Sequence, residues 1–71
     1  MTAEQMASMF TQLGISDCLK GYRSRLEEID GFDRLFGERG REARDASRAR
    51  LQLQVEIAED ALRLRKESGK R

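Results

Sequence analysis

The sequence predicts an all-α protein in which a short N-terminal helix is followed by an antiparallel helical hairpin that assembles as a dimeric helical bundle. Three observations support this prediction. The 71-residue chain contains no proline and is rich in Arg, Glu, Ala and Leu, which favour helices. Gly37 and Gly40 form the clearest interruption in the chain. No glycine or proline lies between Arg41 and about Glu67, which is typical of one long helix.

Composition limits both the size of the core and the chemistry that the chain can perform. A chain of this length forms one small domain, whose core supplies only about 3–5 kcal/mol of stability. It has one cysteine and no histidine, so it lacks an internal disulfide, the commonest general base and the commonest transition-metal ligand. We therefore expect extra stability to come from self-association or a partner, and we expect no enzyme activity, metal or cofactor.

The charge balance and the apolar runs bear on partners and location. Charged residues make up 38% of the chain, but 14 basic residues nearly balance 13 acidic ones. This balance is unlike that of a strongly basic nucleic-acid binder. No apolar run approaches the roughly 20 residues of a membrane span, and the N-terminus lacks the apolar core of a secretory signal. We expect a cytoplasmic protein without a membrane partner or a small-molecule substrate, with Cys18 as a free, buried thiol.

The first predicted helix covers residues 2–13. Thr2 and Gln5 have the spacing of a capping box, and Gly14 is expected to end the helix. The apolar face of this helix consists of Met6, Met9, Phe10 and Leu13. Both core packing and an adaptable, methionine-rich binding face are compatible with such a stripe. Three of these residues, Met6, Met9 and Phe10, are therefore candidate partner-binding residues.

The second predicted helix covers residues 17–36 and is capped by Ser16 or Asp17. Its coiled-coil-like seam consists of Leu19, Tyr22, Leu26 and Ile29. The next seam position is Asp33, so we expect the helix to break or kink near residues 30–31. An apolar plug of Phe32, Leu35 and Phe36 is expected beside the turn. The turn at residues 37–40 leads into a third helix over residues 41–67 and a basic tail at residues 68–71.

The apolar residues of the third helix permit two interpretations. Leu51, Leu53, Val55 and Ile57 alternate with polar residues, as in a half-buried strand. No second strand exists to pair with it, so we favour a helix. Wound as a helix, the apolar residues form two opposed stripes. One stripe consists of Leu51, Val55, Ala58 and Leu62, and the other consists of Leu53, Ile57, Ala61 and Leu64.

The register of the hairpin predicts which stripe faces the second helix. A reversal near Glu38 places Tyr22 opposite Leu53, so the stripe that contains Leu53 is expected to form the hairpin seam. The other stripe is then uncovered. Burying each large aliphatic side chain is worth roughly 1.5–3 kcal/mol, which makes this stripe a candidate interface. Its candidate partner-binding residues are Leu51, Val55 and Leu62.

Three arginines, Arg41, Arg44 and Arg48, continue the uncovered stripe toward the turn. They could form a solvated face paired with neighbouring carboxylates, the rim of an interface with an acidic protein surface, or a phosphate-binding site, since arginine binds oxyanions bidentately.

In size and layout the chain resembles Rop-type dimeric bundles, hairpin co-chaperones of bacterial secretion systems and small phage-encoded proteins that bind host factors.

The sequence thus predicts a non-enzymatic protein-protein interaction module, such as a small adaptor, co-chaperone or inhibitor. It would bind itself as a homodimer, or a partner protein, through the apolar faces of its first and third helices. The alternative is a small nucleic-acid-binding regulator that uses Arg41, Arg44 and Arg48.

Overall fold

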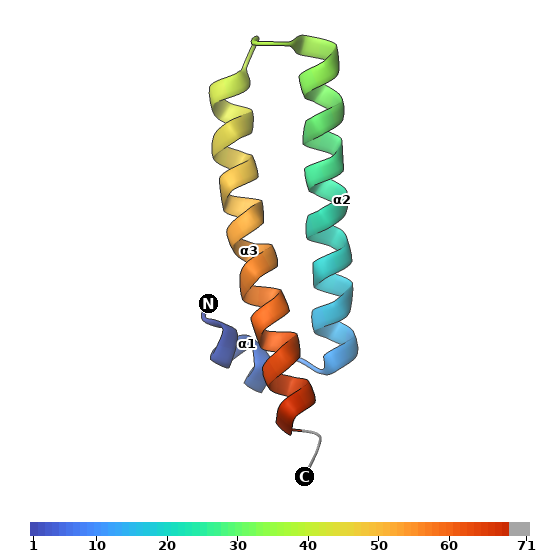
Figure 1. Ribbon diagram of the computed structural model, residues 1–71, viewed down its shortest axis with the longest axis vertical. Helices are drawn as coiled ribbons and strands as arrows, with labels where there is room; N and C mark the ends of the chain where they lie inside the picture. The colour runs from blue at the N-terminus through green and yellow to red at the C-terminus, as the bar shows by residue number, and fades with distance from the viewer. Residues whose placement is uncertain (69–71) are drawn as a thin grey trace.

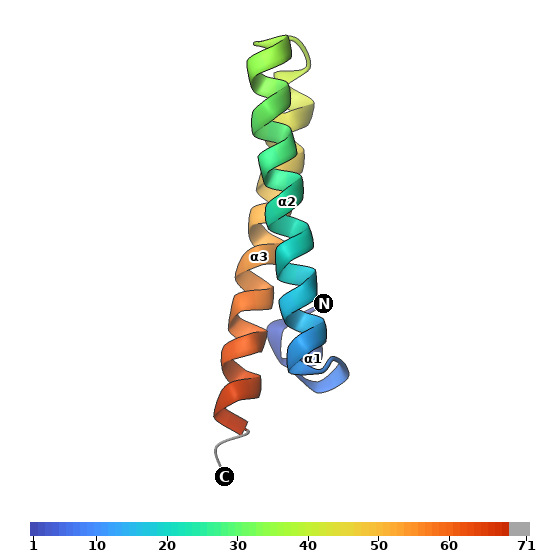
Figure 2. The ribbon, with the colours of Figure 1, turned by 90° about the vertical axis from the view of Figure 1, so that its right-hand side faces the viewer.

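The computed structural model describes residues 1–68, which form three helices (Figure 1). Helix α1 spans Ala3–Met9, α2 spans Gln12–Phe36 and α3 spans Arg41–Ser68. Helices α2 and α3 form an antiparallel hairpin, and α1 packs at the open end, on one side of the hairpin (Figure 2). The molecule measures 50 × 17 × 14 Å. The predicted all-α fold, a short helix followed by a helical hairpin, is confirmed.

The junction between α1 and α2 differs from the predicted one. Helix α1 begins at the expected capping box, in which Thr2 Oγ1 accepts a hydrogen bond from Gln5 N at 3.1 Å. It ends at Met9, because Thr11 Oγ1 accepts a hydrogen bond from Gly14 N at 3.0 Å and caps α2. The predictions that the first helix reaches residue 13, that Gly14 ends it, and that residue 16 or 17 caps the next helix were wrong.

Helix α2 is continuous through residues 30–31, so the predicted break there is absent. A single glycine in a helix interior costs only about 1 kcal/mol relative to alanine, which neighbouring contacts can offset. The charged seam residue, Asp33, needs no break either, because arginines of α3 reach across to it. A polar residue at a seam position thus changes the type of contact between the helices without ending α2.

The turn lies at the predicted residues, and the two glycines explain its shape. Gly37 and Gly40 have positive φ angles of 59° and 73°, a conformation that side-chain-bearing residues rarely adopt. Helix α3 then runs unbroken from Arg41 to Ser68, which excludes the strand interpretation of its alternating stretch. Ser68, predicted to start the basic tail, belongs to α3, and the rest of that predicted tail lies outside the described residues.

The buried core lies at the open end, where the three helices meet. It consists of Met6, Ile15, Leu19, Ala58 and Ala61, which are at most 5% exposed. Cys18, expected to be buried, is a free thiol that packs against this cluster and is half-buried. The half of the hairpin next to the turn is called the turn half below. In the part of the chain that the structure describes, no residue of the turn half is fully buried. The hairpin therefore has a packed end and a loosely covered end.

The stripe of α3 that faces α2 is the opposite of the predicted one. Arg48 of α3 forms an ion pair with Asp33 of α2, and Leu51 lines a groove together with Tyr22 of α2. Leu53, placed in the seam by the sequence, is 53% exposed. The turn fixes which residues are level with each other, but it does not fix the rotation of α3 about its own axis. A shift of two residues, from Leu53 to Leu51 opposite Tyr22, is about 200° of rotation.

Candidate functional site

The predicted arginine face is largely occupied by contacts within the chain. Arg44 donates from Nε to Asp33 Oδ1 at 2.6 Å and from Nη1 to the Arg39 carbonyl at 2.5 Å, and it also donates to the Gly37 carbonyl. Arg48 donates from Nη1 to Asp45 Oδ1 at 2.6 Å, and its Nη2 contacts the carboxylates of Asp33 and Asp30. These contacts join the end of α2, the turn and the start of α3.

Electrostatics reinforce this arginine–aspartate network. The hydrogen bond from Arg44 is the largest influence on the Asp33 carboxyl and holds its pKa below the ordinary value, against the opposing effect of desolvation; Arg48 adds to the lowering. The hydrogen bond to Asp33 in turn raises the pKa of Arg48. The side chains of Arg44 and Arg48 are only 13% and 23% exposed, whereas that of Arg41 is 61% exposed. Most of the N–H donors of Arg44 and Arg48 are thus directed at other groups of the same chain.

The six apolar candidate residues fall into three different environments. Met6 is 4% exposed and belongs to the core. Leu51, Val55 and Leu62 are half-buried on the stripe of α3 that faces α2. Met9 and Phe10 are exposed, at 69% and 37%, where α1 leads into α2. The structure therefore does not bring these residues together in one surface.

Exposed apolar residues that the sequence did not single out as a binding site lie beside the turn. Phe32, Leu35 and Phe36 are 47%, 75% and 53% exposed, and the two phenyl rings lie with their centroids 6.1 Å apart. The sequence predicted them as a packed plug, but Asp33 occupies the seam position and leaves them beside the seam. The available signal was Asp33 itself, because a charged residue at the seam position interrupts the apolar seam beside which these three residues lie.

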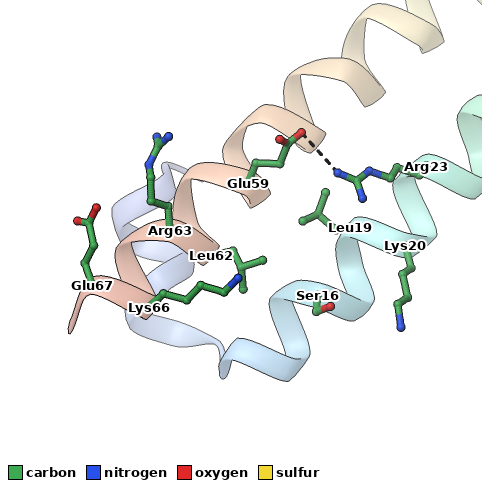
Figure 3. Close-up of a pocket in the computed structure, with 9 residues that line it drawn as sticks. All are labelled: Ser16, Leu19, Lys20, Arg23, Glu59, Leu62, Arg63, Lys66 and Glu67. Atoms are coloured by element: carbon green, nitrogen blue, oxygen red, sulfur yellow. Dashed lines mark ion pairs between the residues drawn. The ribbon is translucent and has the colours of Figure 1, made fainter. Parts of the chain in front are cut away.

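A hollow lies between α2 and α3 at the open end (Figure 3). It is an open groove of about 540 Å³ with Leu19 and Leu62 at its floor and charged side chains around it. Arg23 Nη2 lies 3.8 Å from Glu59 Oε1 across the groove (Figure 3). The other charged residues that line it are Lys20, Arg63, Lys66 and Glu67. Four of the charged lining residues are therefore basic, and two, Glu59 and Glu67, are acidic.

A second groove lies nearer the turn, between the same two helices. It holds about 310 Å³, and its lining residues are Tyr22, Arg25, Ser47, Arg50, Leu51 and Gln54. No acidic residue lines it. Neither Arg25 nor Arg50 forms an ion pair within residues 1–68. This groove is called the turn-half groove below.

Comparison of the chain with models of protein families, with curated proteins and with solved structures found no match. Among the described residues, no three His, Cys, Asp or Glu side chains are placed to hold a metal ion. Within the same part of the chain, no helix combines the length and the apolar character that crossing a membrane requires.

Proposed function

We propose that this protein is a non-enzymatic protein-binding module, of the adaptor, co-chaperone or inhibitor type, that presents apolar side chains on a helical hairpin. One observation carries the proposal: more large apolar side chains are exposed than buried. Only three large apolar residues, Met6, Ile15 and Leu19, are buried among the described residues. Eight are exposed: Met1, Met9, Phe10, Leu13, Phe32, Leu35, Phe36 and Leu53. Clustered apolar exposure of this kind marks interaction surfaces.

Six of these eight exposed side chains belong to two short segments of the chain. The junction cluster, where α1 meets α2, consists of Met9, Phe10 and Leu13; the turn cluster consists of Phe32, Leu35 and Phe36. The total accessible surface is 5571 Å², whereas a compact monomer of this mass exposes roughly 4500 Å². The difference, on the order of 1000 Å², is similar to the area of about 800 Å² that each partner contributes to a standard protein–protein interface.

The nucleic-acid alternative is less favoured by the geometry. Phosphate binding needs guanidinium donors that are free to leave the protein surface. Arg44 and Arg48 direct most of theirs at Asp33, Asp45 and turn carbonyls. Only Arg41 of the three is largely exposed, and one arginine is too few for an electrostatic binding face.

The proposal is tested by sedimentation of the pure chain together with affinity capture from a host lysate. We expect either a concentration-dependent assembly or a captured protein that is lost in the double variant Phe32→Ser, Phe36→Ser. The matched control is Glu27→Ser, which changes an exposed polar side chain on the same helix. A wild-type chain that remains monomeric at high concentration and captures no protein would contradict the proposal.

A further inference from the structure

We propose that the turn-half groove accepts an acidic amphipathic helix of a partner protein, which extends the layer of α1 toward the turn. This inference rests on the proposed protein-binding function and adds to it the binding site and the charge of the partner. It is carried by three features of the groove: its position beside α1, its apolar edges and its unpaired arginines.

The turn-half groove lies on the same side of the hairpin as α1. Cys18, Arg25 and Phe32 follow one another at intervals of seven residues and so share one stripe of α2. Cys18 packs beside the core that α1 covers, and Arg25 lines the groove. On α3, Leu53 lies one turn before Ile57, which also packs against that core. The face of the hairpin on which α1 packs therefore extends along both α2 and α3 into the turn half.

No described element occupies the rest of that side. Arg65 Nη1 donates to the Ala7 carbonyl at 3.1 Å, and Met6 packs with Ala58 and Ala61, so α1 lies level with the C-terminal part of α3. Figure 2 shows α1 on one side of the hairpin at the open end, with nothing above it on that side. The free part of α3, from Arg41 to about residue 56, is about 24 Å long, which matches a helix of about 16 residues.

The edges of the free stretch suit helix packing. A helix in the groove would cover the turn-half faces of Phe32, Phe36 and Leu53, which are 47%, 53% and 53% exposed. On α3 the neighbouring side chains, Ala43 and Ser47, are small and exposed. Ala58 and Ala61, which are also small, are fully buried in the core where α1 packs, so small residues on α3 already permit close approach of a third helix.

The charge of the groove selects the partner. Arg25 of α2 and Arg50 of α3 line the groove, and no carboxylate lines it. Carboxylates on a docked helix would form charge-assisted hydrogen bonds with these free guanidinium groups. A second copy of the chain, packed through the same face, would instead bring two arginines from each copy together, and such like-charge contacts disfavour association. An acidic helix from another protein therefore fits the groove better than a second copy does.

The test is a selection from a display library of amphipathic helices of about 16 residues, with an apolar stripe and with Asp, Glu, Lys, Arg and Gln allowed at every polar position. We expect wild-type protein to enrich acidic peptides. The enriched peptides should bind the charge-reversed variant Arg25→Glu, Arg50→Glu at least about tenfold more weakly, because both ionic contacts become repulsive. The control variant, Arg23→Glu, changes an arginine that pairs with Glu59 in the groove at the open end. It should leave the affinity of the enriched peptides for the protein within about twofold.

The possible failures are distinguishable. Enriched peptides without an acidic bias, whose binding is lost in Phe32→Ser, Leu53→Ser, would overturn the charge of the proposed partner but leave the protein-binding function standing. A wild-type chain that sediments as a dimer, dispersed by the same two substitutions, would replace the acidic helix with a second copy. Enrichment of no peptide, combined with a monomeric chain that captures no host protein, would overturn both proposals.

Discussion

At the scale of single residues, Asp33 connects α2 to α3 in the turn half through two ion pairs. It occupies a seam position that a coiled coil would fill with an aliphatic side chain, and it accepts hydrogen bonds from both Arg44 and Arg48. In the sequence, its charge at that position predicts a break or kink in the second helix. In the structure it links α2 to α3, because a carboxylate that two long basic side chains can reach forms contacts that an isolated seam aspartate lacks.

The first prediction follows from the lowered pKa of Asp33. A carboxyl whose pKa is depressed in the folded state contributes stability above its unfolded pKa of about 3.9, and the contribution is lost as the pH falls through the folded value. Wild-type protein should therefore be more stable than Asp33→Asn near neutral pH, and this advantage should disappear below about pH 4. Chemical unfolding followed by circular dichroism between acidic and neutral pH measures it. An equal pH response in Asp17→Asn, an exposed control, would contradict the assignment.

The second prediction concerns Gly37. Its φ is 59° and its ψ is −126°, whereas a Cβ added there would meet no atom within 4 Å. The cost of Gly37→Ala is therefore one of backbone conformation, and we expect a loss of about 1–3 kcal/mol in unfolding free energy. The chain is short enough for chemical synthesis, so D-alanine at this position provides the control: it favours positive φ and should be tolerated. Equal destabilisation by both enantiomers would indicate a steric cause instead.

At the scale of helices, the sequence predicts the long uninterrupted element well and the junctions poorly. Helix α3 was predictable because no glycine or proline interrupts it. The start of α2 was mispredicted because Gly14 fits two roles, a residue that ends one helix or a residue in the first turn of the next. Thr11, whose hydroxyl accepts from Gly14 N, decides between them, and its capping role depends on a chain reversal that spacing alone does not reveal.

The third prediction tests the continuity of α2. Gly31 lies inside the helix, and a Cβ added there would meet no atom within 4 Å. Gly31→Ala should raise the free energy of unfolding by about 0.5–1 kcal/mol, because alanine loses less backbone entropy in a helix. Gly21, which has equally open surroundings, is the matched site, and Gly21→Ala should give a similar gain in urea unfolding. A loss of stability only in Gly31→Ala would point to a kink at that residue.

The fourth prediction concerns the anchoring of α1. Met6 is 4% exposed, and Met9 on the same short helix is 69% exposed. Met6→Ala should lower the free energy of unfolding by about 2 kcal/mol, since it leaves a cavity among the three helices. Met9→Ala should change it by less than about 0.5 kcal/mol. Thermal unfolding of both variants makes the comparison, and similar losses would mean that α1 packs through a different face.

At the scale of the whole molecule, the two stripes of α3 could be recognised from the sequence, but their assignment could not. Both stripes have an apolar residue at each turn level, so periodicity does not distinguish them. Which stripe faces α2 depends on contacts with two other elements at once. Helix α1 packs on the side of α3 that carries Ile57 and Ala61, and Asp33 of α2 forms ion pairs with Arg44 and Arg48. The expectation that the stripe with Leu51, Val55 and Leu62 is uncovered was wrong for the same reason, because α2 lies against that stripe. The role of these residues in binding a partner stays a prediction.

The fifth prediction follows from the uneven core. Among residues 1–67, every fully buried residue lies at the open end, and partly exposed ion pairs of the kind that join the turn half contribute little beside apolar burial. Amides around Leu19 and Ala58 should therefore exchange hydrogen slowest, and amides around Ile29 and Ala46 at least about tenfold faster. Hydrogen-exchange mass spectrometry of the isolated chain measures this gradient.

A bound partner should then change the gradient in a defined way. If an acidic helix occupies the turn-half groove, protection should rise around Ile29 and Ala46 and change little around Leu19, because only the turn half gains buried apolar surface. The variant Arg25→Glu, Arg50→Glu should keep the gradient of the free chain but lose this added protection. Uniform exchange along both long helices of the free chain would show that the turn half is as well packed as the open end, and it would remove the physical reason for expecting a partner there.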